Sequence, residues 1–330
     1  MKDTFSIAMC TYNGSRYLSA QLDSIRTQTR LPDELVVCDD ASKDDTVRII
    51  EQFSATAPFH VRTEVNHRTL GSTKNFEKAI GLCSGTIIAL ADQDDEWLPT
   101  KLETIEEQFN SQPSVGLVFS DADLIDSDSR PLGVRLWPSI GFDEKVQQLM
   151  KTDHSLDVLL PGWTVTGATM AFHSQFVPVL LPIPDDLPMI HDGWIAAVLG
   201  AVTKVSYIEQ PLIKYRQHEQ QQIGALKTSL RDQKKGVESF REALNRTNSY
   251  SSLILVGNRV RSRLAERCET FDCSVALQKL DARIAHLRTR ERLPRAKWRR
   301  LPSVFRELFA RRYHLYSNGL SSAFKDLILR

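Results

Sequence analysis

Apolar and polar segments alternate along the N-terminal two thirds of the chain. Short apolar runs rich in β-branched residues, typical of buried strands, alternate with segments whose apolar residues recur at helical spacing. The predicted strands cover residues 5–10, 35–38, 60–65, 86–91, 115–120, 163–172 and 205–208. The predicted helices cover residues 17–28, 46–53, 102–109 and 191–199, with another ending near Cys83. Repeated strand, loop and helix units predict an α/β fold with a mainly parallel sheet, which binds ligands beyond the carboxyl ends of its strands.

Polar residues cluster where these predicted strands end. Thr11, Tyr12 and Asn13 follow the first strand, and Asp39 and Asp40 follow the second. The loop before the third helix combines a glycine and hydroxyl groups with Lys74 and Asn75, which suits phosphate oxygens at a helix N-terminus. Neither a Gly-x-Gly-x-x-Gly nor a Gly-x-x-x-x-Gly-Lys-[Ser/Thr] motif occurs, which disfavours a dinucleotide-dependent dehydrogenase and a P-loop NTPase.

Three carboxylates, Asp92, Asp94 and Asp95, follow the buried strand 86–91. Unless a positive charge sits among them, they repel one another and raise each other's pKa. Oxygen ligands in an Asp-x-Asp pattern suit Mg²⁺ or Mn²⁺ with open positions for water and phosphate oxygens. One alternative is a solvated acidic turn that caps a helix beginning near Leu98. A rival metal pair is Asp121 and Asp123, where the strand 115–120 is expected to end.

Two later residues are candidates for chemistry. Asp192 opens an apolar helix, where it is either an N-cap or, if its pKa is raised, a carboxylate base. His218 follows Tyr215, Arg216 and Gln217 after a late strand. It is either a surface residue or a ligand to a metal or a diphosphate.

Chain length and cysteine content limit the classes of protein that are possible. A chain of 330 residues is long enough for one large domain with an extension, and we expect these to cover residues 1–224 and 225–330. Five cysteines without close spacing indicate reduced thiols. The N-terminus enters a strand directly, and no run approaches the length of a membrane span. We therefore expect a cytoplasmic protein, either soluble or peripheral on the inner face of the cell membrane.

The C-terminal segment is strongly basic although the formal net charge is only +1. Its apolar residues fall at helical spacing and need a partner, either the first domain or another subunit in a homo-oligomer. An anionic membrane surface is the expected partner. A solvated basic face and a nucleic-acid contact are the alternatives, and we expect no nucleic-acid partner. The basic residues are Arg283, Arg288, Arg290, Arg292, Arg295, Lys297, Arg299, Arg300, Arg306, Arg311 and Arg312.

The ordered motifs together resemble the family 2 glycosyltransferases of GT-A fold, and within them a bacterial rhamnosyltransferase-like branch. The resemblance covers roughly residues 5–224, and a C-terminal pattern from Tyr316 to Asp326 also resembles that branch. Six motifs in order are far more specific than any one of them. They are Thr11-Tyr12-Asn13-Gly14, Val37-Cys38-Asp39-Asp40-Ala41-Ser42, Lys74-Asn75-Phe76, Ala91-Asp92-Gln93-Asp94-Asp95-Glu96-Trp97, His191-Asp192-x-Trp194 and Tyr215-Arg216-Gln217-His218.

The resemblance implies a role for each matched residue. The nucleotide is expected against Thr11, Tyr12 and Asn13, with Asp39, beside Asp40, hydrogen-bonded to a pyrimidine base. Lys74 and Asn75 match positions near the ribose and diphosphate, and Arg216 belongs to the same donor site. Asp94, Asp92 and His218 match the metal site. Asp192 matches the catalytic base.

The resemblance therefore implies an inverting, metal-dependent transfer of a sugar, with dTDP-L-rhamnose as the favoured donor and a UDP-sugar as the other. The acceptor would be a saccharide or a lipid-linked saccharide in cell-surface polysaccharide assembly, such as O-antigen or capsule. A phosphotransferase or nucleotidyltransferase and an inactive scaffold subunit are the alternatives. Two departures concern specificity: Gly193 replaces the usual aromatic residue, and Glu219 replaces the usual glycine.

Overall fold

The computed structural model describes residues 3–152, 154–218, 249–267, 271–317 and 319–328. The expected domain boundary at 224/225, the departure at Glu219 and the start of the C-terminal helical pattern lie outside these ranges.

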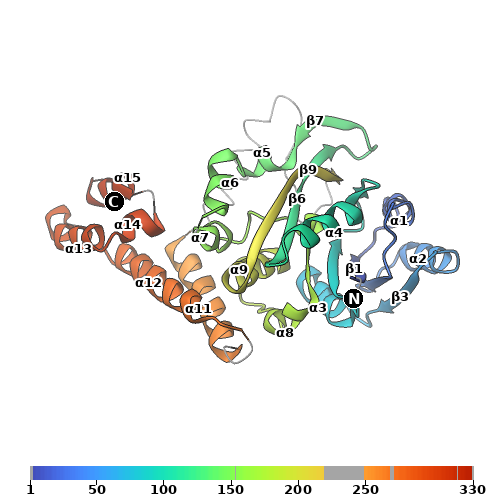
Figure 1. Ribbon diagram of the computed structural model, residues 1–330, viewed down its shortest axis with the longest axis horizontal. Coiled ribbons are helices and arrows are strands. Elements are labelled where there is room, and N and C mark those ends of the chain that lie inside the picture. Colours follow the sequence, from blue (N-terminus) through green and yellow to red (C-terminus); the bar gives the residue numbers. More distant parts are fainter. Residues whose placement is uncertain (1–2, 153, 219–248, 268–270, 318, 329–330) are drawn as a thin grey trace.

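The described strands form a nine-stranded mixed sheet in the order β3-β2-β1-β4-β8-β6-β9-β5, with β7 beside β6 (Figure 1). Strands β1 to β4 are mutually parallel where they pair, whereas β8 is antiparallel to both β4 and β6. The strands are β1 Phe5–Thr11, β2 Glu34–Asp39, β3 His60–Val65, β4 Ile87–Ala91, β5 Glu96–Trp97, β6 Val115–Ile125, β7 Pro131–Arg135, β8 Met170–His173 and β9 Lys204–Arg216.

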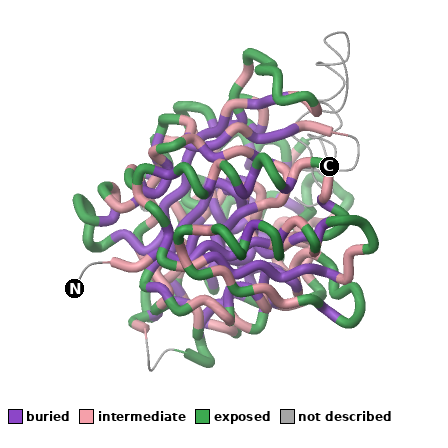
Figure 2. Tube along the Cα trace, turned by 90° about the vertical axis from the view of Figure 1, so that its right-hand side faces the viewer, coloured by how far each residue is buried: buried purple, intermediate pink, exposed green. Residues whose placement is uncertain are grey.

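Helices cover the sheet, and strands such as β1, β2, β4 and β6 form the buried centre of the molecule, whereas β3 and β7 are more exposed (Figure 2). Every residue of β4 is fully buried between β1 and β8, as its continuous apolar run predicts. The helices of this part are α1 Leu18–Arg26, α2 Thr46–Ser54, α3 Ser72–Leu82, α4 Lys101–Ser111, α5 Leu136–Ile140, α6 Glu144–Met150, α7 Ser155–Leu159, α8 Val177–Leu180 and α9 His191–Val202, with 3-10 turns η1 Gly167–Thr169 and η2 Ser174–Phe176.

Several predicted boundaries are wrong. The strand predicted to end at Ser120 continues to Ile125, because β9 pairs with it along the added length. Of the strand predicted over 163–172, only β8 forms, since Thr169 N–H donates to the Thr166 carbonyl and closes the turn η1. The strand predicted over 205–208 is much longer, because β9 runs from Lys204 to Arg216 beside β6. The helix predicted over 102–109 is α4, which begins at Lys101 and not near Leu98 as the alternative had it, because the Leu98 N–H donates to the Leu212 carbonyl.

The C-terminal helices extend to one end of the molecule (Figure 1). Apolar residues of the first two, including Val260 and Leu280, join the main core. The last three pack around a separate small cluster of Val304, Tyr313 and Ala323. Among the described residues, no helix has both the length and the apolar character that a membrane span requires. These helices are α11 Tyr250–Arg267, α12 Ser274–Glu291, α13 Lys297–Phe309, α14 Arg312–Tyr316 and α15 Gly319–Ile328.

Candidate active site

The carboxyl ends of β1 and β2 are joined through the buried carboxylate of Asp39. Thr11 Oγ1 donates to Asp39 Oδ2 over 2.8 Å, and Ser42 donates its hydroxyl to the same oxygen and its N–H to Oδ1. These bonds fix the two loops predicted to hold the nucleotide. Thr11 and Asp39 therefore lie together, as predicted, and both are engaged in shaping the loops.

Asp40 and Asn75 anchor the loop between β3 and α3. Asp40 accepts the N–H groups of Leu70 and Gly71 and the amide of Asn66, at 2.7 to 2.9 Å. Asn75 is buried and donates to the Cys38 carbonyl over 2.7 Å. Both residues are at the predicted edge of the sheet, where the described contacts make them supports of the loop.

The loop after β1 is pinned to the acidic loop by Gln93. Gln93 Oε1 accepts the Tyr12 N–H over 2.8 Å, and Gln93 Nε2 donates to the Tyr12 carbonyl over 3.1 Å. The Tyr12 side chain is half exposed. Asn13 has a positive φ of 47° and accepts the Lys43 N–H over 2.8 Å. The Tyr12 ring thus stands on a hydrogen-bonded turn with half of its surface open to solvent, and its contact with a nucleotide remains a prediction.

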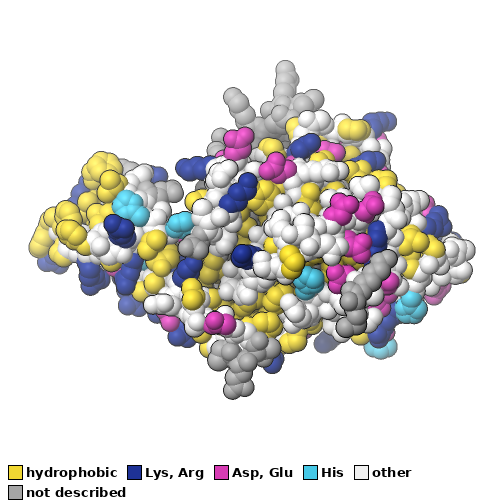
Figure 3. Space-filling model, in the orientation of Figure 1, with side chains coloured by type: hydrophobic (Ala, Val, Ile, Leu, Met, Phe, Trp, Pro, Cys, Tyr) yellow, Lys and Arg dark blue, Asp and Glu magenta, His cyan; other side chains and the backbone are white. Residues whose placement is uncertain are grey.

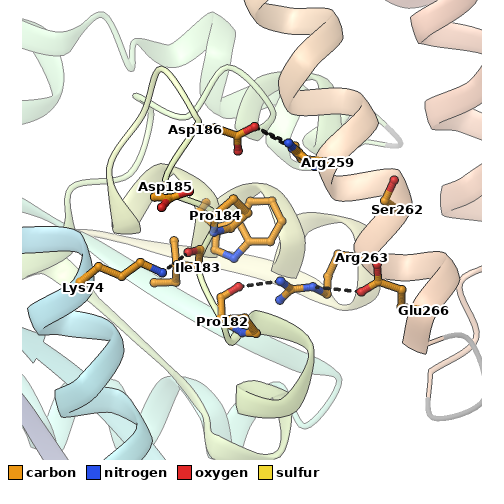
Figure 4. A pocket seen from close by; sticks show the side chains of 11 residues that line it. Lys74, Pro182, Ile183, Pro184, Asp185, Asp186, Arg259, Ser262, Arg263 and Glu266 are labelled. Atoms are coloured by element: carbon orange, nitrogen blue, oxygen red, sulfur yellow. Dashed lines mark hydrogen bonds and ion pairs between the residues drawn. The ribbon is translucent and has the colours of Figure 1, made fainter.

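Lys74 lines a different hollow. Its ammonium donates to Glu77 over 2.9 Å and to the Ile183 carbonyl over 2.6 Å. It lies on the wall of a cavity of about 560 Å³ between the 182–186 segment and α11 (Figure 4). The described contacts of its ammonium do not include the acidic loop of Asp92 to Asp95, and contact with a diphosphate remains a prediction.

The acidic loop holds the predicted metal ligands. Asp94 Oδ2 is 2.7 Å from His218 Nε2, so the late histidine reaches the Asp-x-Asp motif. Burial, with the charges of Asp94 and Asp192, raises the pKa of Asp92 to about 7. Burial also raises the pKa of Asp95, whose Oδ2 atom is buried without a hydrogen-bond partner. Three carboxyl groups therefore lie close together in this loop, where burial and mutual repulsion oppose their ionisation.

Arg216 is almost completely buried and ties the acidic loop to β6. Its guanidinium donates to the Asp94 carbonyl over 2.6 Å and to Glu96 Oε1 over 2.8 Å. It also contacts Ser129 and lies 4.6 Å from the centre of the Tyr17 ring. These contacts give Arg216 a positioning role; its predicted contact with the donor is untested.

Asp192 is the second residue of α9, not its N-cap as the alternative interpretation had it. Its oxygens accept the N–H groups of Gly193 over 2.6 Å and of Gly167 over 3.2 Å. Burial raises its pKa to about 6, a value that suits a base near neutral pH. Its charge contributes to the raised pKa of Asp92, so the candidate base lies within electrostatic range of the acidic loop.

Gly193 explains one departure from the family pattern. A Cβ atom at Gly193 would lie 2.3 Å from the Gly162 carbonyl oxygen. The 161–162 turn therefore fills the space that an aromatic side chain would need.

Lys101 is a residue that the sequence reasoning missed. It is fully buried, donates to the Ala168 carbonyl over 2.6 Å and lies 3.8 Å from the centre of the Trp97 ring. Burial lowers its pKa to about 7, opposed by the charges of Asp95 and Asp92. Because Ala168 adjoins Gly167, Lys101 connects the acidic loop to the turn that holds Asp192. The only sign of its burial in the sequence is its position directly before Leu102, the first apolar residue of the predicted helix.

A divalent cation fits this chemistry. Within the described ranges no group of three or more His, Cys, Asp or Glu side chains forms a metal cage. Mg²⁺ is commonly held by one or two carboxylates together with substrate phosphates, and the carboxyl groups around Asp94 meet that requirement. Asp94 and His218, with Asp92 nearby, are the residues that would hold the ion.

The rival pair is engaged elsewhere. Asp121 lies inside β6, where its Oδ1 atom accepts the N–H groups of Trp137 and Ala122. Arg135 lies within 3.9 Å of Asp121 and 3.8 Å of Asp123. These contacts account for the pair without a metal.

Residues 6–157 match the family described as glycosyl transferase family 2. This part of the chain belongs to that family. The matched residues of the family 2 domain include the loops after β1 and β2 and the acidic loop, whereas Asp192 and His218 lie beyond them.

Two relatives of the family 2 domain show how far the similarity reaches. An uncharacterized glycosyltransferase of Nostoc is 27% identical over 219 residues, which are 64% of this chain and 64% of the relative. The dTDP-rhamnosyl transferase RfbG of Shigella flexneri is 28% identical over 227 residues, which are 66% of this chain and 74% of RfbG. The chain thus spans less than two thirds of the length of the Nostoc relative, so similarity alone does not define the activity of the whole protein.

Solved structures confirm the predicted fold class of the family 2 domain and the helical C-terminal region. Residues 1–349 of S. aureus TarS, in complex with UDP-GlcNAc, have a TM-score of 0.52 at 15% identity, covering 93% of this chain and 92% of that TarS fragment. The mannosyltransferase PcManGT of Pyrobaculum calidifontis, in complex with GDP-Man and Mn²⁺, has a TM-score of 0.50 at 18% identity, covering 94% and 75% of the two chains. At these identities the likeness concerns the fold alone.

Proposed function

We propose that the protein is a metal-dependent, inverting glycosyltransferase of cell-surface polysaccharide assembly. The donor is a nucleotide sugar, dTDP-L-rhamnose in the first instance and a UDP-sugar otherwise, and the acceptor is a saccharide or lipid-linked saccharide. The similarity to RfbG supports this donor. One observation carries the proposal: the charge of Asp192, at the start of α9, helps to raise the pKa of Asp92 in the acidic loop, which supports a candidate base close to the candidate metal ligands.

The donor half is built by the loops after β1, β2 and β4. Tyr12 and Asn13 stand on turns fixed by Gln93 and Lys43, which reduces the ordering that donor binding requires. Mg²⁺ or Mn²⁺ on Asp94 and His218 would neutralise the charge that develops on the leaving diphosphate.

The acceptor half centres on Asp192. Its carboxylate accepts the proton of an acceptor hydroxyl while that oxygen attacks the anomeric carbon, and the bond to the nucleoside diphosphate breaks on the opposite face. The N–H groups of Gly167 and Gly193 hold the carboxylate in place. One displacement inverts the anomeric configuration, and no covalent sugar intermediate forms.

Calorimetry and transfer assays on purified protein test the proposal. We expect dTDP or UDP to bind with Mn²⁺ and to lose affinity with a chelator. Asp192→Asn should retain donor binding while transfer falls by roughly a thousandfold or more, whereas Asp94→Ala should weaken metal-dependent donor binding. Asp123→Ala is the matched control for Asp94→Ala, because it removes a carboxylate of the rival pair.

Three outcomes would contradict the proposal in different ways. Normal transfer by Asp192→Asn would remove Asp192 as the base. Loss of metal-dependent binding in Asp123→Ala but not in Asp94→Ala would move the metal to the rival pair. Nucleotide binding without any turnover would favour a scaffold subunit.

A further inference from the structure

Helices α13 and α15 each expose apolar side chains that the rest of the described chain does not cover. On α13, Trp298, Leu301, Phe305 and Phe309 recur at intervals of three and four residues and therefore share one face. Trp298 is 69% exposed and Phe309 is 86% exposed. On α15, Leu320, Phe324 and Ile328 are likewise exposed. Together these residues are called the C-terminal apolar face.

Basic side chains border this face, and no exposed carboxylate is found among the described residues from 292 to 328. The acidic residues there, Glu307 and Asp326, are buried and paired, Glu307 with His286 and Asp326 with Arg290. Figure 3 shows apolar side chains gathered over the α13 and α15 end of the molecule, with Lys and Arg along one edge. The exposed basic residues are Arg292, Arg295, Lys297, Arg299, Arg306, Arg311 and Lys325.

Other arginines of the basic segment are buried and stabilise the fold. Arg283 is buried and pairs with Asp157. Arg300 is 2% exposed and donates to the backbone carbonyls of Pro294 and Arg295. Some basic residues of this segment, such as Arg283 and Arg300, therefore make internal contacts, whereas the exposed ones lie on the surface of the C-terminal helices.

We propose that the C-terminal apolar face, with its basic border, docks onto a bilayer surface that contains anionic lipids. Aromatic and aliphatic side chains on one helix face with Lys and Arg beside them are the composition of helices that lie in the membrane interface. Anionic headgroups complement the uniformly basic border. A second copy of the chain is the poorer fit, because it would bring the same basic border against the first.

Vesicle co-sedimentation of the full chain tests this. Vesicles of phosphatidylcholine with phosphatidylglycerol should bind the protein, and vesicles of phosphatidylcholine alone should bind it far less. Added salt should weaken the binding, because the headgroup attraction is screened.

Two sets of substitutions separate the apolar and the charged contributions. The triple variant Arg299→Gln/Arg306→Gln/Lys325→Gln should lower partitioning on the order of a hundredfold. The triple variant Trp298→Ser/Phe305→Ser/Phe309→Ser should also abolish most of it. The control for the first is Arg48→Gln/Arg62→Gln/Lys204→Gln, and the control for the second is Val275→Ser, an exposed apolar residue on α12.

The inference does not depend on the chemistry of the proposed active site. All variants should keep the melting temperature and the nucleotide affinity of the wild type in solution, which separates a failure here from a failure of the proposed function. Equal binding to both vesicle types, no binding, or unchanged binding by both triple variants would overturn it. So would a wild-type dimer that both triple variants dissociate, in the absence of vesicle binding, because the face would then join two copies.

Discussion

Burial raises the pKa of the Asp192 carboxyl to about 6. A base must be ionised to accept a proton, so activity should fall as the pH drops through about 6. We expect kcat to fall about tenfold for each further pH unit. A kcat profile measured with saturating metal and donor checks this, and the residual rate of Asp192→Asn should lack the step. A profile that stays flat through this range would contradict the assignment.

Lys101 offers a second test at the level of one side chain. Lys101→Met keeps the length of the side chain but removes the amino group. Asp95 and Asp92 then lose the buried basic group beside them, and the Ala168 carbonyl loses its hydrogen-bond donor. The free energy of unfolding should decrease by roughly 3 kcal/mol. Because the η1 turn holds Asp192, kcat should decrease more than donor affinity. Denaturant unfolding and steady-state kinetics measure both effects.

The exposed Lys204 provides the control for that substitution. Lys204→Met should leave stability and kcat near wild type. Equal losses of kcat and of donor affinity in Lys101→Met would show that Lys101 supports the fold as a whole rather than the position of Asp192.

Individual residues differ in how much of their role the sequence reveals. Asp94 and His218 are brought together as the motifs predict, because both follow strands that end at one edge of the sheet. The sequence also predicts Arg216 and Lys74 at that edge, but it does not predict their hydrogen-bond partners. Their partners, Glu96 and the Ile183 carbonyl, are distant in sequence, and no local pattern encodes such a contact.

Among the elements, the start of α9 depends on a close backbone contact. A methyl group at Gly193 would lie 2.3 Å from the Gly162 carbonyl oxygen, so Gly193→Ala must displace either the 161–162 turn or α9. We expect a loss of about 1 to 3 kcal/mol of stability and a lower kcat, because Asp192 is the preceding residue. Thermal melting and steady-state kinetics check both.

Gly200→Ala on the same helix is the matched control. There the added Cβ would meet the Leu159 side chain at 2.6 Å, which can adjust by rotation. A Gly193→Ala variant as stable and active as Gly200→Ala would contradict the tight fit.

Elements with strong periodicity could be predicted, and those defined by their partners could not. The buried runs that form β1, β2 and β4 are visible in the sequence because sheet neighbours on both sides demand continuous apolar residues. The two-residue strand β5 exists through its pairing with Lys214 and Ile213. Strand β6 runs past Ser120 into acidic residues because β9 continues beside it.

For the whole molecule, the structure contains two cores of very different size. The small cluster of Val304, Tyr313 and Ala323 is supplemented by buried polar pairs, such as His286 with Glu307 at 2.8 Å. Hydrogen exchange should therefore be faster in α13 and α15 than in β1 and β4. Mass spectrometry of labelled peptides measures this, and equal protection in both regions would contradict it.

The expected division at 224/225 is untested, but the packing shows how the C-terminal part is organised. Helices α11 and α12 contribute to the main core, whereas α13 to α15 form the separate cluster. The sequence indicated a basic helical extension correctly, yet composition alone could not tell buried arginines such as Arg283 and Arg300 from exposed ones. That distinction depends on which helix face meets another helix.

The short antiparallel strand β8 has a consequence for how such proteins diversify. It hydrogen bonds to β4 on one side and to β6 on the other, through positions such as Phe172. The nucleotide loops lie on the β1 to β4 side of this seam, and the parallel pair β6 and β9 lies on the other. A chimera that exchanges the strands on one side of β8 must therefore keep the β8 pairing positions, and it must also keep the β5 to β9 pairing, which links the segment after β4 to the other side of the sheet.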